Sequence, residues 1–421
     1  MINRMGLAIV LVCCRFLSAE QIVGVQAAAL DQPRVYMALW RDPAKAPLAF
    51  DKSKMPELEA LKGLGLDAGD GPTFAVRAFL DTGASDTMIS TGTAAGLGIR
   101  PQVFGGKAAK VFDVGVSGEE SFGISEPLYV GISDFSSSQE GGNPAGYVRT
   151  KAPTSLKMRE QEGMLEQLTG GIDVAGMPVM MGKVVVIDAR GLADLELLKT
   201  RVVEAKDKSI PATDSAIKLS YVDFTRFTRV EPAGAKRPVM AGNPMIGPHP
   251  FQKVEPAKNE AAKPVVIGLG KHEAKLTMLL DTGAAASMIS TKTASQLGIT
   301  VGDDGWLIGV PRAKQFQLPI GGIGGSSNVT GFIADSLTLP VAKGEPIIYS
   351  GAPVLVKDIS VTDSVTHEEF TLDGIFGMNF LVASVQITGG LLPDIGRSGA
   401  SPFTMIVIDN AAGELRLKIN K

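Results

Sequence analysis

One motif occurs twice in this chain, and it constrains the fold more than any other feature of the sequence. Residues Phe79–Ser90 read FLDTGASDTMIS, and residues Leu279–Ser290 read LLDTGAAASMIS. Aligned without a gap, positions 80–99 and 280–299 match at about fourteen of twenty places, which is typical of an internal duplication. Because both copies carry the same local signals, we expect two units of the same fold, each presenting one Asp-Thr-Gly turn.

The residues around each motif predict the same short series of elements. Apolar or alternating runs before the motif are typical of strands, and they cover Thr73–Leu80 and Ala274–Leu280. After the motif, Thr91–Leu97 and Thr291–Leu297 predict short helices. Each unit is therefore expected to begin with a strand, a sharp turn, a second strand and a helix.

Later segments of the two units correspond more loosely. In each unit an apolar-apolar-Gly group, ending at Gly176 and at Gly377, precedes a predicted terminal strand. These strands are Lys183–Asp188 (KVVVID) and Thr404–Asp409 (TMIVID). The duplication thus extends over most of both halves.

The length and the distribution of turn-forming residues predict two domains. A chain of 421 residues is too long for one ordinary core. The segment 231–263 is crowded with Pro, Gly, Ala and Lys and predicts a linker without regular structure. We therefore expect an N-terminal lobe over residues 30–230 with Asp81 and a C-terminal lobe over residues 264–421 with Asp281. Within the first lobe, Leu30–Gly71 can be an inhibitory pro-segment, an interlobe strand with an insertion, or both, and Val35–Trp40 favours an edge strand.

The N-terminus resembles an export signal. A basic residue precedes the apolar run Gly6–Cys14, and Ala27–Ala29 offers the small residues that a signal peptidase prefers, so residues 1–29 are predicted to be a signal peptide. The run is much shorter than the roughly 20 residues of a membrane-spanning helix, and a short buried helix is the alternative. Removal of this segment would take both cysteines, Cys13 and Cys14, out of the mature protein. The predicted location is therefore periplasmic or extracellular, in a bacterium.

The composition excludes several classes of function. The 41 basic and 44 acidic side chains nearly balance, so nothing indicates a nucleic-acid partner. The three histidines lack paired ligand spacing, and no glycine-rich run completes a nucleotide motif, so neither a metal nor another cofactor is expected. Partners must therefore be recognised by shape rather than by net charge.

The duplicated aspartates indicate general acid–base chemistry. A carboxylate can activate water as a base, and a protonated carboxyl can polarise a carbonyl as an acid, but one group cannot do both at once. Two carboxyls within hydrogen-bond reach share a proton, because their like charges prevent both from ionising. Asp81 and Asp281 are therefore the predicted catalytic pair, one from each unit.

These motifs resemble those of pepsin-like and retropepsin-like aspartic proteases. The resemblance covers most of residues 73–190 and 264–421 and implies an all-β, bilobal, double-psi-barrel fold, with the active site inside one monomeric chain. It implies an aspartic endopeptidase that needs no cofactor. It also implies supporting roles for three pairs of residues, which are Thr82 and Thr282, Gly83 and Gly283, and Gly176 and Gly377.

The same resemblance implies hairpin flaps that close over a bound peptide. In the second half the glycine-rich run contains Gly321, Gly322, Ile323 and Gly324, and in the first half the matching place contains Val116 and Ser117. The pepsin flap tyrosine has no clear counterpart in this sequence.

Three further points follow from the residues near the motifs. Alanine follows the turn glycine in each copy, at Ala84 and Ala284, so no hydroxyl favours the charged carboxylate and we expect activity at mildly acidic pH. Asp86 occurs only in the first copy and is predicted to be a solvated strand-edge residue. Two alternatives stay open: a peptide-binding protein that keeps the site without cutting, and a duplication whose aspartates only shape turns.

Overall fold

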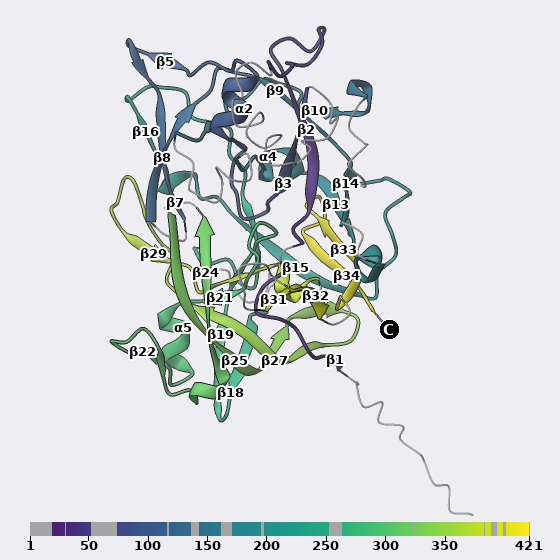
Figure 1. The fold of residues 1–421 in the computed structure, drawn as a ribbon, viewed down its shortest axis with the longest axis vertical. Coiled ribbons are helices and arrows are strands. Elements are labelled where there is room, and N and C mark those ends of the chain that lie inside the picture. Colours follow the sequence, from purple (N-terminus) through teal and green to yellow (C-terminus); the bar gives the residue numbers. More distant parts are fainter. Residues whose placement is uncertain are drawn as a thin grey trace, which may run out of the picture.

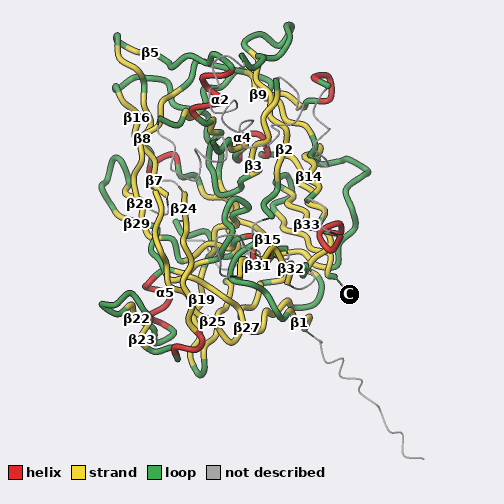
Figure 2. Tube along the Cα trace, in the orientation of Figure 1, coloured by secondary structure: helices red, strands yellow, loops and turns green. Residues whose placement is uncertain are grey.

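The computed structural model describes residues 19–29, 31–51, 74–115, 118–135, 143–160, 171–194, 198–251, 263–322, 325–382, 384–388, 394–398 and 401–420. The protein is mostly β-strand, with a few short helices, as predicted (Figure 2). Figure 1 shows most of the first half of the chain in the upper part of the molecule and most of the second half in the lower part, although β1 (Glu20–Ile22) lies at the bottom, beside β27 (Ile347–Val356). No helix in these ranges is long and apolar enough to cross a bilayer.

A ten-stranded sheet surrounds the first Asp-Thr-Gly turn, and we call this part the first unit. Its strands, in spatial order, are β10 (Val148–Arg149), β9 (Tyr129–Ser133), β2 (Arg34–Trp40), β3 (Ala75–Leu80), β12 (Val174–Ala175), β4 (Met88–Ile89), β11 (Lys157–Met158), β8 (Gly118–Ile124), β7 (Lys110–Gly115) and β16 (Arg229–Glu231). The predicted edge strand is wrong in one respect, because β2 pairs with strands on both sides and is almost fully buried.

A larger, sixteen-stranded sheet surrounds the second turn and extends beyond it, and we call the part around this turn the second unit. Its main path is β14 (Lys199–Glu204), β13 (Lys183–Asp188), β33 (Phe403–Asp409), β34 (Glu414–Ile419), β15 (Ser215–Val222), β17 (Asn243–Ile246), β20 (Met278–Leu280), β30 (Gly374–Phe376), β21 (Met288–Ile289), β27 (Ile347–Val356), β25 (Gly325–Leu339), β18 (Val265–Leu269) and β19 (His272–Leu276). Beside this path lie β1 (Glu20–Ile22), β24 (Gln315–Gly322) and β26 (Val341–Lys343).

Smaller elements complete the described structure. The two-stranded sheets are β5 (Val103–Phe104) with β6 (Lys107–Ala108), β22 (Thr300–Val301) with β23 (Leu307–Ile308), β28 (Ser360–Thr362) with β29 (Glu369–Thr371), and β31 (Ser384–Thr388) with β32 (Asp394–Ser398). The helices are α2 (Thr91–Gly96), α4 (Met177–Met180) and α5 (Thr291–Gln296), with short 3-10 turns η2 (Pro144–Gly146), η3 (Arg190–Asp194), η4 (Thr225–Phe227), η5 (Arg312–Lys314) and η6 (Met378–Phe380).

The helices after the motifs form for the same local reason in both units. Ser90 and Ser290 cap α2 and α5, and each accepts a hydrogen bond from the backbone three residues later. Two residues after each helix ends stands a glycine with positive φ, 61° at Gly98 and 76° at Gly298, a conformation that glycine adopts without a steric penalty. Both predicted helices are therefore confirmed.

The corresponding terminal strands of the two halves pair with each other. β13 lies beside β33 (Figure 1). The two strands are antiparallel, and Val186 is opposite Val407. Their side chains are buried on both faces of the sheet, so this pairing stabilises the contact between the two halves by apolar burial as well as by hydrogen bonds. Hydrophobic packing thus fixes how the units face one another.

Two predictions of domain boundaries need comment. The predicted linker 231–263 contains regular structure after all, because the apolar residues of β17 are buried between β15 and β20. The first 18 residues of the predicted signal peptide lie outside the described residues. Its end is packed on the second unit, where β1 pairs with β27 and the Ala29 N–H donates to the Ala285 carbonyl at 2.8 Å.

Candidate active site

Each Asp-Thr-Gly turn is mounted on a buried strand. Asp81 follows β3, and its backbone N–H donates to the Ala175 carbonyl of β12 at 3.1 Å. Asp281 follows β20, and its N–H donates to the Phe376 carbonyl of β30 at 3.0 Å. The apolar residues before each aspartate therefore hold it in a sheet that cannot shift without breaking the core.

Backbone amides of each turn hold the carboxylate of the same turn. Gly83 and Ala84 donate to Asp81 Oδ1 at 2.7 and 3.2 Å. In the second turn, the N–H groups of Gly283 and Ala284 donate to Asp281 Oδ1, both at 2.9 Å. These bonds orient one oxygen of each carboxyl.

The two carboxyls meet, as the sequence predicted. The side chains of Asp81 and Asp281 are hydrogen-bonded to each other. A Cβ on Gly83 would lie 2.4 Å from Cγ of Asp281, and a Cβ on Gly283 would lie 2.4 Å from Cγ of Asp81. Each turn glycine is therefore required by the carboxyl of the opposite unit, which any side chain would displace.

The threonines of the two turns exchange hydrogen bonds across the interface. Thr82 Oγ1 donates to the Leu280 carbonyl at 2.6 Å and accepts from the Thr282 N–H at 3.1 Å. Thr282 Oγ1 donates to the Leu80 carbonyl at 2.5 Å and accepts from the Thr82 N–H at 3.1 Å. Both threonines are buried, so this network locks the two turns into one register.

The electrostatics of the pair favour one shared proton. Burial raises the pKa of Asp81, although hydrogen bonds from Asp281 and from the turn amides oppose that rise. Burial and then the charge of Asp81 raise the pKa of Asp281 well above its usual range. By whole-residue surface area, Asp81 and Asp281 are both partly exposed. The two carboxyls therefore titrate as one coupled pair.

Gly176 and Gly377 lie directly beneath the turns. A Cβ on Gly176 would overlap the Asp86 carbonyl at 1.9 Å, and a Cβ on Gly377 would lie 2.8 Å from the Ala284 carbonyl. The residue after each glycine donates to the turn above, Met177 to Ala84 at 2.9 Å in the first unit. Only glycine allows this close backbone approach.

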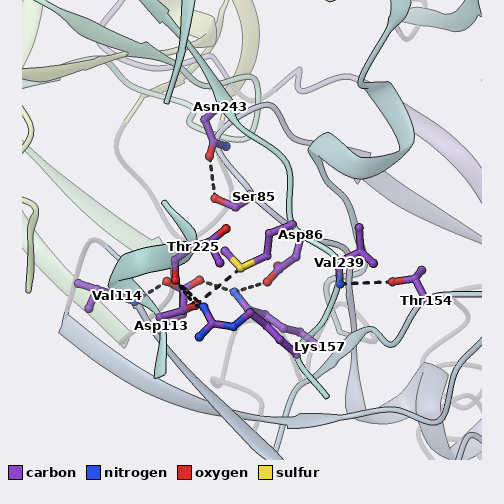
Figure 3. A network of polar contacts seen from close by, with 12 residues as sticks. Ser85, Asp86, Asp113, Val114, Thr154, Lys157, Thr225, Val239 and Asn243 are labelled. Carbon is purple, nitrogen blue, oxygen red and sulfur yellow. Dashed lines mark hydrogen bonds and ion pairs between the residues drawn. The ribbon is translucent and has the colours of Figure 1, made fainter. Parts of the chain in front are cut away.

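Asp86 is not solvated, so that prediction is wrong. It is 2% exposed, and its Oδ2 lies 2.9 Å from Nζ of the buried Lys157, which also contacts Asp113 (Figure 3). Burial raises the pKa of Asp86 to about 6 against the opposing effect of Lys157. Burial alone would lower the pKa of Lys157, but the two carboxylates raise it above its ordinary value. We call Asp86, Lys157 and Asp113 the ionic triad.

The predicted flap residues are described only in part. Gly321 and Gly322 lie at the end of β24, in the hairpin that β24 forms with β25. Ile323 and Gly324, like Val116 and Ser117 of the first half, lie outside the described residues. The β7–β8 and β24–β25 hairpins occupy the same place in the chain order of their units, after the motif helix.

Several site residues escaped the sequence analysis. Asn243 and Gln32 donate side-chain hydrogen bonds to the first and second turns. Asn379 accepts from both the N–H and the hydroxyl of Ser287, whose Oγ accepts from the Gly377 N–H. Asn243, Gln32 and Asn379 lie outside the repeated motif, and only their placement in the fold reveals them.

Comparisons with known proteins add no assignment. No model of a known protein family matches the chain, and no curated protein sequence is significantly similar to it. Among the described residues, no group of three or more His, Cys, Asp or Glu side chains is arranged to hold a metal ion.

Proposed function

We propose that this protein is an aspartic endopeptidase with a bilobal fold of the pepsin-like and retropepsin-like kind. One observation carries the proposal: two carboxyls, each from one copy of a duplicated turn, are hydrogen-bonded to each other and framed by reciprocal threonine bonds. A pair of turn-forming aspartates would gain nothing from this arrangement, because bringing two buried carboxyls together is unfavourable.

The pair divides the chemistry of peptide hydrolysis. Ionised Asp81 takes a proton from a water molecule while the water oxygen attacks the carbonyl carbon of the peptide bond. Asp281 gives its proton to the carbonyl oxygen, so the intermediate is a neutral tetrahedral diol. Asp81 then gives the proton that it took from water to the peptide nitrogen, and Asp281 takes a proton from a hydroxyl of the diol. The C–N bond breaks, the products are a carboxyl and an amine, and the pair is again singly protonated.

The second hairpin offers a surface for an extended peptide. Phe316, Leu318 and Ile320 alternate along β24 and pack, half-buried, on the cluster that also contacts Ala284. In the described part of the chain, β24 pairs only with β25, so its other edge can accept a strand. The proposed substrate is therefore an extended peptide or unfolded protein with apolar side chains near the cut.

Replacement of either aspartate tests the mechanism. Asp81→Asn and Asp281→Asn should each lower cleavage of a denatured protein mixture by at least about 1,000-fold, because general acid–base catalysis and the shared proton are both lost. The exposed Asp303→Asn is the matched control and should retain full activity. Full hydrolysis by either site variant would contradict the proposal.

A statine-type transition-state mimic separates the two remaining functions. Cleavage that the mimic blocks selects the peptidase, whereas tight binding of the mimic by a protein that cuts nothing selects a peptide receptor. The localisation, periplasmic or extracellular, is part of the proposal and is tested by fractionation of the source cells.

The pH dependence gives an independent check. Because burial raises the pKa of both aspartates and no hydroxyl lies after the turn glycines, the singly protonated pair should persist into mildly acidic conditions. The rate of peptide cleavage should therefore peak at mildly acidic pH. A maximum near pH 2 would mean that the pair is much more acidic than its surroundings require.

A further inference from the structure

Asn243 ties the first Asp-Thr-Gly turn to a strand of the second unit. It begins β17, which pairs with β20, and its side chain is fully buried. Its Nδ2 donates to the Thr82 carbonyl at 2.8 Å. Its Oδ1 accepts from Ser85 Oγ at 2.6 Å, as Figure 3 shows. One side-chain amide therefore holds two points of the turn that follows Asp81, at Thr82 and at Ser85.

Gln32 makes the reciprocal connection. It lies just before β2, which pairs with β3 of the first unit, and its Nε2 donates to the Gly283 carbonyl in the second turn. The neighbouring backbone repeats this pattern. Ala29 donates to the Ala285 carbonyl at 2.8 Å, and Ala241 donates to the Ser85 carbonyl at 2.9 Å.

The strand register shows that the two amides are structural equivalents. Arg34 lies opposite Phe79, and Met245 lies opposite Leu279, the matching residue of the second motif. Gln32 and Asn243 each stand two residues before these paired positions. The fold has thus placed a side-chain amide at the same point in both units, although no sequence motif marks it.

We propose that Gln32 and Asn243 are positioning residues. Gln32, just before β2 of the first unit, holds the aspartate turn of the second unit, and Asn243, at the start of β17 of the second unit, holds the aspartate turn of the first. This inference deepens the proposed function and rests on it for its kinetic readout. The Thr82 carbonyl shares a planar peptide unit with the Gly83 N–H, and the Gly283 carbonyl shares one with the Ala284 N–H. These two N–H groups orient the carboxylates, so loosening either carbonyl moves them. Small displacements of reacting groups can lower a rate by about 100-fold.

Substitution of the two amides tests the proposal. For Gln32→Ala and Asn243→Ala we expect kcat to fall about 10- to 100-fold and KM to change less than about threefold, because the reacting carboxyls, not the substrate contacts, are disturbed. A statine-type mimic should bind more weakly by a similar factor. Asn243→Ser, whose hydroxyl can donate to the Thr82 carbonyl, should recover part of the loss.

The matched control is Gln102→Ala. That amide also bridges two segments, to Ser155 Oγ and from the Lys236 N–H, but it touches neither turn. Its removal should leave kcat unchanged. Should Asn243→Ala fail to fold, the half-buried Gln32, with a single bond to the turn, still decides the question.

A readout independent of cleavage distinguishes this inference from the proposed function. Carbon-13 NMR titration of the aspartate carboxyls should show two separated steps for the wild-type pair, and Gln32→Ala should bring these steps closer together. A wild-type protein that cuts nothing refutes the peptidase, but the titration still tests the positioning role. Unchanged kinetics and an unchanged titration in both variants would overturn the inference.

Discussion

The two Asp-Thr-Gly turns have almost the same hydrogen bonds, but the side chains packed beside the two turns differ in chemical type. In the first unit the turn ends in buried Asp86, which pairs with Lys157 on β11. In the second unit the matching residue of the motif is Ala286, and the matching residue of the adjacent strand, β27, is Leu355. We call Asp86 and Lys157 the first wall, which is ionic, and Ala286 and Leu355 the second wall, which is apolar.

Register identifies these counterparts. Lys157 lies opposite Met88 in a parallel pair, and Leu355 lies opposite Met288 in the same kind of pair. The two methionines occupy the same position of the repeated motif. The cation and the leucine therefore occupy one structural site.

The third member of the ionic triad also has an apolar counterpart. Asp113 faces Glu120 in the first hairpin, and Ile320 faces Ser327 in the second. The two positions lie the same number of residues along their hairpins from the residue that pairs with Lys157 in the first unit and with Leu355 in the second. Asp113 and Ile320 are therefore structural counterparts. The same backbone thus accepts three ionisable groups or three apolar ones, so the duplicated fold requires volume and shape at these sites rather than charge.

Removing the cation should have the largest effect on this wall. Lys157→Leu should lower the free energy of unfolding by about 3–5 kcal/mol, because Asp86 and Asp113 lose a buried partner. Lys110→Leu is the control, since its pair with Glu160 is partly exposed and should contribute less than about 1 kcal/mol. Urea unfolding measures both. Equal losses would show that the ionic triad is no more stabilising than a surface pair.

The pH dependence of stability should differ between wild type and Asp86→Asn. Folded Asp86 keeps its proton to about pH 6, whereas in the unfolded chain it ionises near pH 4. Its contribution to stability is therefore complete below about pH 4 and is lost as the pH rises to about 6, by at most about 3 kcal/mol. Urea unfolding at several pH values should show a fall that is larger in the wild type than in the variant, since Asp81 and Asp281 titrate in both. Parallel profiles would place the pKa of Asp86 near its ordinary value.

Replacing the ionic triad with its apolar counterparts from the second unit should nearly restore the stability that Lys157→Leu alone removes. The triple substitution Asp86→Ala, Lys157→Leu and Asp113→Ile reproduces the apolar set and should be within about 2 kcal/mol of wild type, or more stable, because a buried ionic group often gains little over apolar packing. Thermal unfolding checks it against Lys157→Leu alone. A triple variant less stable than the single one would mean that the surroundings have adapted to charge.

The smallest effect should come from the outer edge of the first hairpin. β16 covers the edge of β7, and Arg229 stacks 3.8 Å from the centroid of the Phe112 ring and pairs with Glu119 at 3.6 Å. Both charged groups are exposed, so Arg229→Gln should change stability by less than about 1 kcal/mol. A larger loss in urea unfolding would show that this cover, which β24 lacks in the described structure, stabilises the hairpin.

Local signals in the sequence predicted the parts of the site that lie within the repeat. The apolar run, the Asp-Thr-Gly turn and the serine-capped helix are set by neighbours in the chain, and the structure has them in both units. The same reasoning failed for Asp86, which is buried. A single aspartate in a turn is normally solvated, and only the partner Lys157, distant in sequence, permits its burial.

By itself the sequence determined that there are two copies of one turn and that each copy presents a carboxylate, because duplication and turn chemistry are local properties. Tertiary structure decided that the two carboxyls meet. It also decided that the amides of Gln32 and Asn243 each bond to the turn of the opposite unit, and that the first wall is charged. These features depend on strand register and on the packing of β13 against β33. Register joins residues that are far apart in the chain, and no short stretch of sequence contains that information.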